Sequence, residues 1–386
     1  MLGHVKLQQG QIDEALRLQE RALDTLLHSD TRSYSTALSD QRAQIGFLLG
    51  VQGRWAEALT VYEERDQGLR SNAAQFASSG SNNITWAMAL LKRQRAPEAE
   101  KMLRAIINWN LRKPFVDPLY LAYLHGYLGV VLVDAGKNDD ALAEFREAFP
   151  VLIRQADSDN SSENGGFVRP YRLRLIADGY LELLSQMSAA RTEQTGFDPA
   201  AEAFQVAEVA RGSSVQLAIA SSAARASLPD AALADLARRE QDTANQISAL
   251  NNLLIRLASE SESNRLDKTI ADIRKDVSQL DAQRTQLRKE LAERFPAYAE
   301  LVLPKPPTPA SVQKVLHPNE AAVAFYVAEK QTYVWTITPT RTAFRAVPMT
   351  RQQVDQHIAA LRRAFDLTGA ALIPFDGAAA SSLYAA

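Results

Sequence analysis

Apolar positions in the first half of the chain recur with a helical period, in segments that come in pairs. In each pair a small residue follows an apolar one, a turn comes seven residues later, and an alanine follows five residues after the turn. The spacings between these alanines are 43, 41 and 42 residues. Self-similarity at a fixed period is the sequence signature of a helical repeat array. The repeats are expected near residues 1–30, 38–70, 82–110 and 119–150, and their alanines are Ala15, Ala58, Ala99 and Ala141.

The small residues have a physical reason at each position. Gly3, Gly46, Ala87 and Gly129 allow two helices to approach closely, and the later alanines pack against the first helix. Turn glycines tolerate a positive φ because they have no Cβ. They stand at 10, 53 and 136, whereas the third repeat has Gln94. A fifth helix pair is expected over residues 171–221, after a polar loop at 156–166.

This pattern resembles the tetratricopeptide repeat family. The fourth repeat is the clearest match, with Leu128, Gly129, Gly136, Ala141 and Phe145 at the family spacing and Pro150 at its end. The period near 42 exceeds the family value of about 34, which corresponds to roughly one added turn in each helix. The resemblance implies an α-solenoid over residues 1–225, with a concave surface that binds a protein or peptide.

By register, three residues of the first helices are candidates for that concave surface. They are Lys92, Tyr123 and Asp134. Each of them is also compatible with ordinary packing or solvation, so the sequence leaves both interpretations open.

Residues 226–303 show a narrower apolar stripe with alternating steps of three and four. This spacing is typical of a coiled coil. Glu240 interrupts the first arm, and the polar segment 259–263 separates two arms of similar length, which favours an antiparallel helical hairpin. Pairing with another chain remains an open alternative. The stripe residues are Leu233, Leu236, Thr243, Ile247, Leu250, Leu254 and Leu257, then Leu266, Ile270, Ile273, Val277, Leu280, Leu287 and Leu291.

The periodicity changes after the proline-rich connector at 304–309. Segments 321–327, 333–338 and 343–347 are short, apolar and β-branched or aromatic, with turn-sized connectors between them. They predict a β-meander. A short helix is expected at 311–316, and Thr350 begins an amphipathic helix. Residues 304–386 are therefore expected to begin an α/β domain.

This segment resembles the beginning of a CHAT domain, which has a caspase-like fold and commonly follows tetratricopeptide repeats. The resemblance lies in Leu316 to Ala321 (LHPNEA), Phe325 to Val327, Tyr333 to Trp335 and Val347-Pro348, and in the helix at 203–211. It implies the regulatory, protein-binding region of a cysteine peptidase cut near the start of that domain. A non-enzymatic tetratricopeptide adaptor with a degenerate CHAT-like lobe remains the alternative.

Composition excludes several kinds of site. The chain has no cysteine, so it can form no disulfide, thiolate metal site or cysteine nucleophile. The net charge of −2 provides no basic excess for nucleic acid. No catalytic residue, cofactor site or metal site is predicted, and no apolar run is long enough for a membrane span. The N-terminus reads as the middle of a helix without a signal peptide, which favours a cytoplasmic location and a cut N-terminus. Oligomeric state cannot be inferred.

Overall fold

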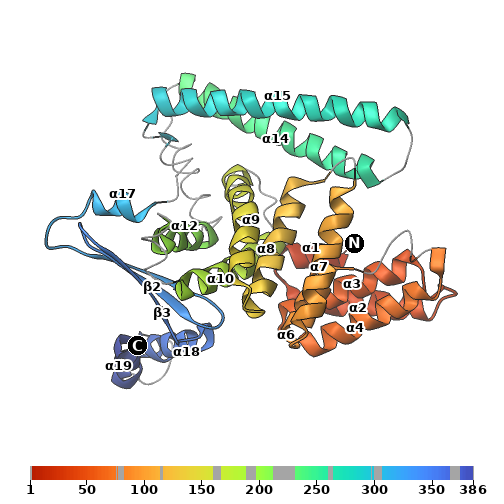
Figure 1. The fold of residues 1–386 in the computed structure, drawn as a ribbon, viewed down its shortest axis with the longest axis horizontal. Helices are drawn as coiled ribbons and strands as arrows, with labels where there is room; N and C mark the ends of the chain where they lie inside the picture. The colour runs from red at the N-terminus through yellow and green to blue at the C-terminus, as the bar shows by residue number, and fades with distance from the viewer. Residues whose placement is uncertain are drawn as a thin grey trace. The chain divides into compact units, whose positions relative to one another are not determined.

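The computed structural model describes residues 2–74, 76, 82–113, 116–159, 167–187, 197–211, 231–259, 264–296, 298–299, 307–365 and 374–385. Within these residues the protein is mainly helical, with fifteen α-helices and one three-stranded antiparallel sheet (Figure 1). The chain divides into two compact units. The repeat unit comprises Met1–Ile176 and Gly212–Lys305, and the sheet unit comprises Ala177–Arg211 and Pro306–Ala386.

This division differs from the three consecutive domains expected from sequence. Residues 177–211, assigned to a fifth repeat, belong to the same unit as the sheet. The second helix of that repeat was expected to reach Ser221, but residues 212–221 lie outside the described residues. The same holds for most of the expected loop at 156–166, for four of the five hinge residues at 259–263 and for half of the connector at 304–309.

In the repeat unit, a helix pair lies at each of the four predicted repeats. Each helix packs against the next one along the chain, and the first helices of the second, third and fourth pairs also contact each other in that order. All four repeat alanines are fully buried. The pairs are α1 (Leu2–Gln8) with α2 (Ile12–Leu27), α3 (Thr36–Val51) with α4 (Trp55–Arg70), α6 (Ile84–Lys92) with α7 (Ala96–Leu111), and α8 (Pro118–Asp134) with α9 (Asn138–Asp159).

The end of the fourth repeat differs from the prediction. Helix α9 does not stop at Pro150 but continues through it to Asp159. Proline inside a helix removes one backbone hydrogen bond, so it weakens a helix without necessarily ending it. Phe149 and Leu152, on either side of the proline, are buried, and this packing favours continuation of the helix.

The turns inside the pairs share one left-handed residue. Its φ is 73° at Gly10, 75° at Gly53 and 71° at Gly136, and the same position in the third repeat is Gln94 with φ 61°. A side chain in this conformation costs roughly 1–2 kcal/mol. Gln94 therefore adopts the turn of the other repeats at a conformational cost that glycine avoids.

Two other repeat glycines are required by close packing. A Cβ built on Gly46 would lie 2.6 Å from the ring of Tyr62, and one on Gly129 would lie 2.8 Å from the ring of Phe145. In both repeats the ring stands sixteen positions after the glycine. Where the small residue is Ala87, the equivalent position is the more adaptable Leu103. In these two pairs an aromatic ring of the second helix covers the glycine of the first, so a side chain at either glycine would clash with that ring.

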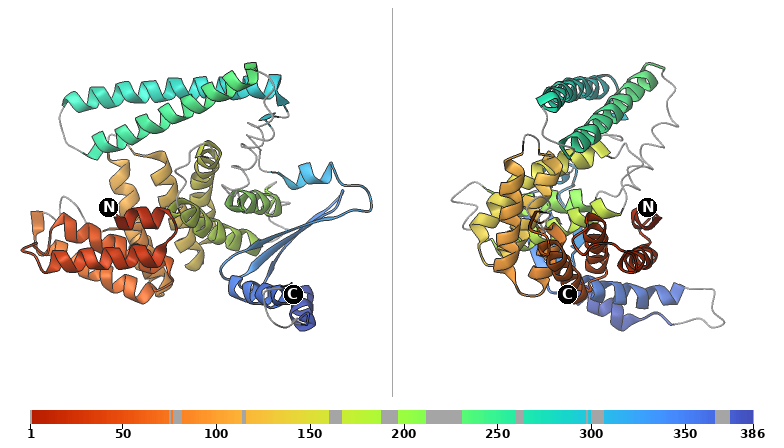
Figure 2. Two further views of the ribbon diagram at one scale, coloured as in Figure 1. Left: turned by 180° about the vertical axis from the view of Figure 1, so that it is seen from behind. Right: turned by 90° about the vertical axis from the view of Figure 1, so that its right-hand side faces the viewer.

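Helices α14 (Ala231–Ser259) and α15 (Asn264–Arg294) form an antiparallel hairpin, visible as two long neighbouring helices in Figure 2. Leu236, near the start of α14, packs with Leu287, near the end of α15, whereas Leu254 packs with Ile270. This pairing of opposite ends establishes the antiparallel direction.

Glu240, which interrupts the apolar stripe of α14, lies in the core of the hairpin. Glu240 is 7% exposed, and its Oε1 accepts hydrogen bonds of 2.8 Å from the Nε atoms of both Arg284 and Arg288. Arg284 occupies the stripe position between Leu280 and Leu287, so both arms are polar at the same level. A polar pair at one level of an apolar seam specifies the register of the two helices.

In the sheet unit, the three strands follow the predicted meander. β1 (Ala322–Val327) pairs with β2 (Thr332–Ile337), and β2 pairs with β3 (Thr342–Val347), both antiparallel. Thr350 caps α18 (Arg351–Arg362) through a capping box, as the predicted helix start requires. The remaining elements are α12 (Pro199–Arg211), α17 (Pro309–Gln313), the 3-10 turn η1 (Arg363–Phe365), α19 (Gly377–Ala385) and the part of α10 (Val168–Gln186) from Ala177 onward.

The two faces of the sheet differ in burial. Trp335 is fully buried, and its Nε1 donates a 3.1 Å hydrogen bond to the Ala200 carbonyl of α12. On the opposite face, Val323 and Phe325 are more than half exposed. Along the β1 edge, guanidinium groups donate to two backbone carbonyls, Arg211 to Phe325 and Arg351 to Val327.

Candidate protein-interaction surface

Residues 167–176, which include the start of α10, lie across helices that are distant in sequence. The backbone N of Phe167 donates to the Gln8 carbonyl at the end of α1, at 3.3 Å. The Tyr171 hydroxyl donates to the Gly50 carbonyl of α3, at 3.4 Å, and its ring makes an edge contact with Phe47 with centroids 6.1 Å apart. The first helices of separate repeats therefore form one receiving surface, and we call residues 167–176 the seated segment.

Arg172 supplies the cation at the centre of this contact. Its guanidinium carbon lies 6.0 Å from the ring centroid of Phe47 and 5.6 Å from that of Tyr123. A guanidinium over an aromatic face contributes about 0.5–2 kcal/mol, and more when water is excluded. Burial raises the pKa of the Tyr123 hydroxyl, whereas the positive charges of Arg169 and Arg172 act in the opposite direction. The aromatic residues thus offer a binding place for an arginine side chain.

A glycine of the receiving surface lies next to the last residue of the seated segment. A Cβ on Gly126 of α8 would lie 2.6 Å from the Cδ1 atom of Ile176, so the absence of a side chain makes room for this isoleucine. At the near end, the rings of Phe167 and Tyr171 stack with centroids 5.8 Å apart. The surface therefore fits an aromatic pair, a guanidinium and an aliphatic side chain in succession.

The three predicted binding residues have different environments. Tyr123 is only 5% exposed, so it is not a free part of a concave surface, because the seated segment covers it. Lys92, the last residue of α6, is half-buried with its ammonium 6.0 Å from the centroid of Trp55. Asp134, the last residue of α8, is exposed. Lys92 and Asp134 occupy equivalent repeat positions, five residues after Ala87 and Gly129.

Sequence reasoning missed the seated segment itself. Its signal is the run from Phe167 to Arg174 (FVRPYRLR), in which two aromatic rings alternate with three arginines. An ordinary repeat helix was expected only from Tyr171 onward, and it gave these side chains no binding role.

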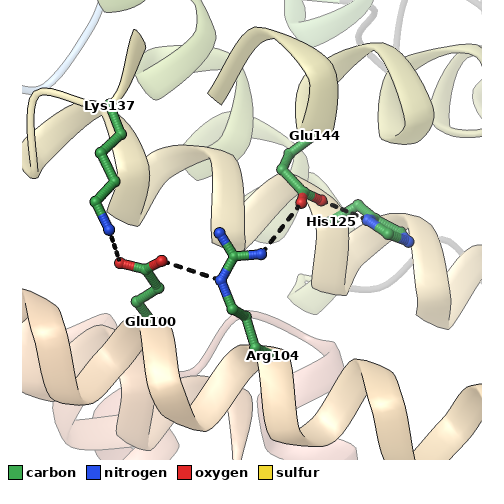
Figure 3. Close-up of polar contacts among 5 residues, drawn as sticks. All are labelled: Glu100, Arg104, His125, Lys137 and Glu144. Carbon is green, nitrogen blue, oxygen red and sulfur yellow. Dashed lines mark hydrogen bonds and ion pairs between the residues drawn. The ribbon is translucent and has the colours of Figure 1, made fainter. Parts of the chain in front are cut away.

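A second concentration of polar groups joins α7, α8 and α9 (Figure 3). Glu100 accepts hydrogen bonds from Lys137 Nζ at 2.8 Å and from Arg104 Nε at 3.0 Å, and Glu144 accepts one from His125 Nδ1 at 2.6 Å. Arg104 also lies 4.0 Å from Glu144, which connects the two halves. The network links the third repeat to the fourth.

The network holds two repeats together through charged and polar contacts. The hydrogen bond from Lys137, followed in importance by that from Arg104, holds the pKa of Glu100 below its ordinary value despite partial burial. Every member has a hydrogen-bond or ion-pair partner inside the network. In the part of the chain that the structure describes, no group of three or more metal-ligating side chains comes together.

The sheet unit contains one strongly perturbed carboxylate. Asp178 of α10 accepts a 2.9 Å hydrogen bond from the Tyr326 hydroxyl and a 3.2 Å bond from the backbone N of Glu329. Burial raises the pKa of Asp178 to about 6, against the opposing effects of these two bonds and of the positive charge of Arg351. Asp178 thus connects α10 to the β1–β2 hairpin and titrates near pH 6.

The raised pKa makes the sheet unit more stable in mild acid. The unfolded carboxyl has a pKa of 3.8, so the folded state binds more protons above that value. The free energy of unfolding therefore falls as pH rises from about 4 to about 6, by no more than roughly 3 kcal/mol.

Asp178→Asn is expected to remove this decrease. Hydrogen exchange of the β1–β2 amides, corrected for the intrinsic pH dependence, measures it. Asp355→Asn, on the exposed face of α18, is the control, and an equal pH effect in all three proteins would contradict the prediction.

Comparisons with known proteins do not identify the ligand of this surface. No protein-family model, no curated protein and no solved structure matches the chain. Among the described helices, none combines the length and the hydrophobicity that crossing a lipid bilayer requires. A functional conclusion therefore rests on the geometry of the receiving surface.

Proposed function

We propose that this chain is a protein-interaction scaffold of the tetratricopeptide type, an α-solenoid whose first helices bind a helical segment of a partner protein. The observation that carries the proposal is that these helices hold a helical segment through aromatic, guanidinium and backbone contacts. A surface that accepts the chain's own helix in this way has the chemistry to accept another.

The repeat geometry supports this proposal. Helices that contact mainly their neighbours along the chain form an extended array, and such arrays present a continuous row of first helices to a ligand. Ion pairs between successive repeats, such as Arg95 with Glu63 at 2.9 Å and Lys137 with Glu100 at 2.8 Å, keep that row in register. We propose that Lys92 and Asp134, at equivalent ends of α6 and α8, contact the partner.

We further propose that residues 304–386 begin a CHAT-type, caspase-like α/β domain, for which the repeat region is a regulatory scaffold. The order of a meander followed by a capped amphipathic helix supports this proposal. We assign no catalytic step to this chain, because a cysteine peptidase requires a cysteine and the chain has none. The role of this region is to bind and to position.

The binding proposal is tested by selecting helical peptides from a display library against the full chain. A selected peptide is expected to bind about tenfold more weakly to Lys92→Glu than to the unaltered protein, which corresponds to about 1.4 kcal/mol. Lys101→Glu is the matched control, because Lys101 is an exposed lysine on the second helix α7. Fluorescence anisotropy measures each affinity. Failure to select any peptide, or equal binding by all three proteins, would refute the proposal.

A further inference from the structure

We infer that the seated segment, residues 167–176, is an internal competitor for the partner-binding surface, and that the partner helix carries the same pattern of side chains. That pattern is an aromatic residue, a second aromatic residue four positions later, an arginine directly after it and an aliphatic residue four positions further on. This inference rests on the proposed function and specifies both the class of partner and its regulation.

The pattern follows from what each part of the surface contacts. The Gly50 carbonyl accepts the Tyr171 hydroxyl, the rings of Phe47 and Tyr123 face the guanidinium, and Gly126 leaves room for Ile176. A planar guanidinium stacks on aromatic rings, whereas a lysine ammonium is compact and strongly hydrated. The surface therefore distinguishes arginine from lysine at this position.

Several contacts in the first half of the seated segment are long. The hydrogen bonds from the Phe167 backbone N and the Tyr171 hydroxyl measure 3.3 and 3.4 Å, at the long end of the range, and both cation–π distances of Arg172 are 5.6 Å or more. Phe167, Tyr171 and Arg172 are each only half-buried. Hydrogen bonds of this kind contribute about 0.5–1.5 kcal/mol each and the guanidinium contacts about 0.5–2 kcal/mol. Ile176, at the other end of the segment, is fully buried. A partner helix with the same side chains would make the same contacts, so it can replace the segment.

Internal competition has a quantitative consequence. The apparent affinity for a partner is reduced by the fraction of molecules in which the surface is open. A substitution that weakens the contacts of the seated segment, without changing the receiving surface, therefore raises the apparent affinity for an external partner. Substitution of a residue that contacts the ligand would instead lower the affinity. The direction of the change in affinity therefore distinguishes an internal competitor from a part of the binding site.

The test uses a labelled peptide of residues 167–176 and the full chain. Fluorescence anisotropy compares the unaltered chain with Tyr171→Ala/Arg172→Ala, which weakens the internal segment and leaves the receiving helices unchanged. The double variant is expected to bind the peptide at least about tenfold more tightly, and a peptide with Arg172→Lys is expected to bind it severalfold more weakly. Equal affinity of the two chains, at unchanged helix content by circular dichroism, would overturn the inference.

A second measurement needs no substitution in the chain. Amide hydrogen exchange of residues 167–176 is followed in the unaltered protein with and without a helical peptide selected from the library. Exchange is expected to increase on binding, because the segment leaves its seat, and unchanged exchange in the presence of bound peptide would overturn the inference. If library peptides bind but do not release the segment, only the inference fails. If the chain's own peptide binds the double variant but the library provides no ligand, the proposed function fails.

Discussion

Trp335→Ala is expected to destabilise the sheet unit by about 3–5 kcal/mol, the range for deleting a fully buried tryptophan. The side chain has no exposed area, and its ring stacks on Phe344 with centroids 4.8 Å apart and meets Phe204 of α12 edge-on at 5.8 Å. Alanine would leave a cavity between the sheet and α12. It would also remove the donor to the Ala200 carbonyl.

Hydrogen exchange of the amides in β2 and α12 measures this loss separately from the repeat unit. The matched control is Phe325→Ala, which removes an aromatic ring from the exposed face of the same sheet and is expected to cost less than about 1 kcal/mol. Similar exchange in the two variants would show that α12 does not depend on Trp335.

Glu240→Ala is expected to destabilise the α14–α15 hairpin by about 3–5 kcal/mol, because it removes one partner of a buried ionic cluster. The two arginines would lose an acceptor that both bind at 2.8 Å, and their charges would stay close together at the helix interface. Replacing Glu240, Arg284 and Arg288 together by leucine is expected to be neutral or to stabilise the hairpin, since no charge then remains to be buried.

Hydrogen exchange over residues 231–259 and 264–294 provides the measurement for both variants. Glu293→Ala is the control, because its pair with Lys289 is 3.8 Å long and both side chains are 65% exposed, and such exposed pairs contribute little. A triple variant as unstable as Glu240→Ala would contradict the expectation that the cost comes from unbalanced charge.

Local patterns predicted the elements well where each residue's role is decided by its neighbours in sequence. The three strands were placed within one residue of their observed bounds, because alternation and the turns between them are local features. The repeat alanines were identified for a similar reason, since a helix pair requires a small residue at the same position in every repeat.

Long-range contacts could not be predicted in this way. The Tyr171 hydroxyl meets a carbonyl 121 residues away, and nothing in the sequence around either residue indicates the other. Tyr123 was therefore expected on an open surface that the chain itself covers. Arg284 was missed because an arginine in a charged helix normally faces water, and only its partner Glu240, 44 residues earlier, explains its burial.

The arginine contacts along β1 have a consequence for growth of the sheet. A strand can join a sheet only where backbone groups are unoccupied, and the carbonyls of Phe325 and Val327 are taken by side chains. Extension on this side would first have to break two charged hydrogen bonds. An additional strand, from this protein or from another molecule, could therefore pair with β1 only after both arginines had moved away from these carbonyls.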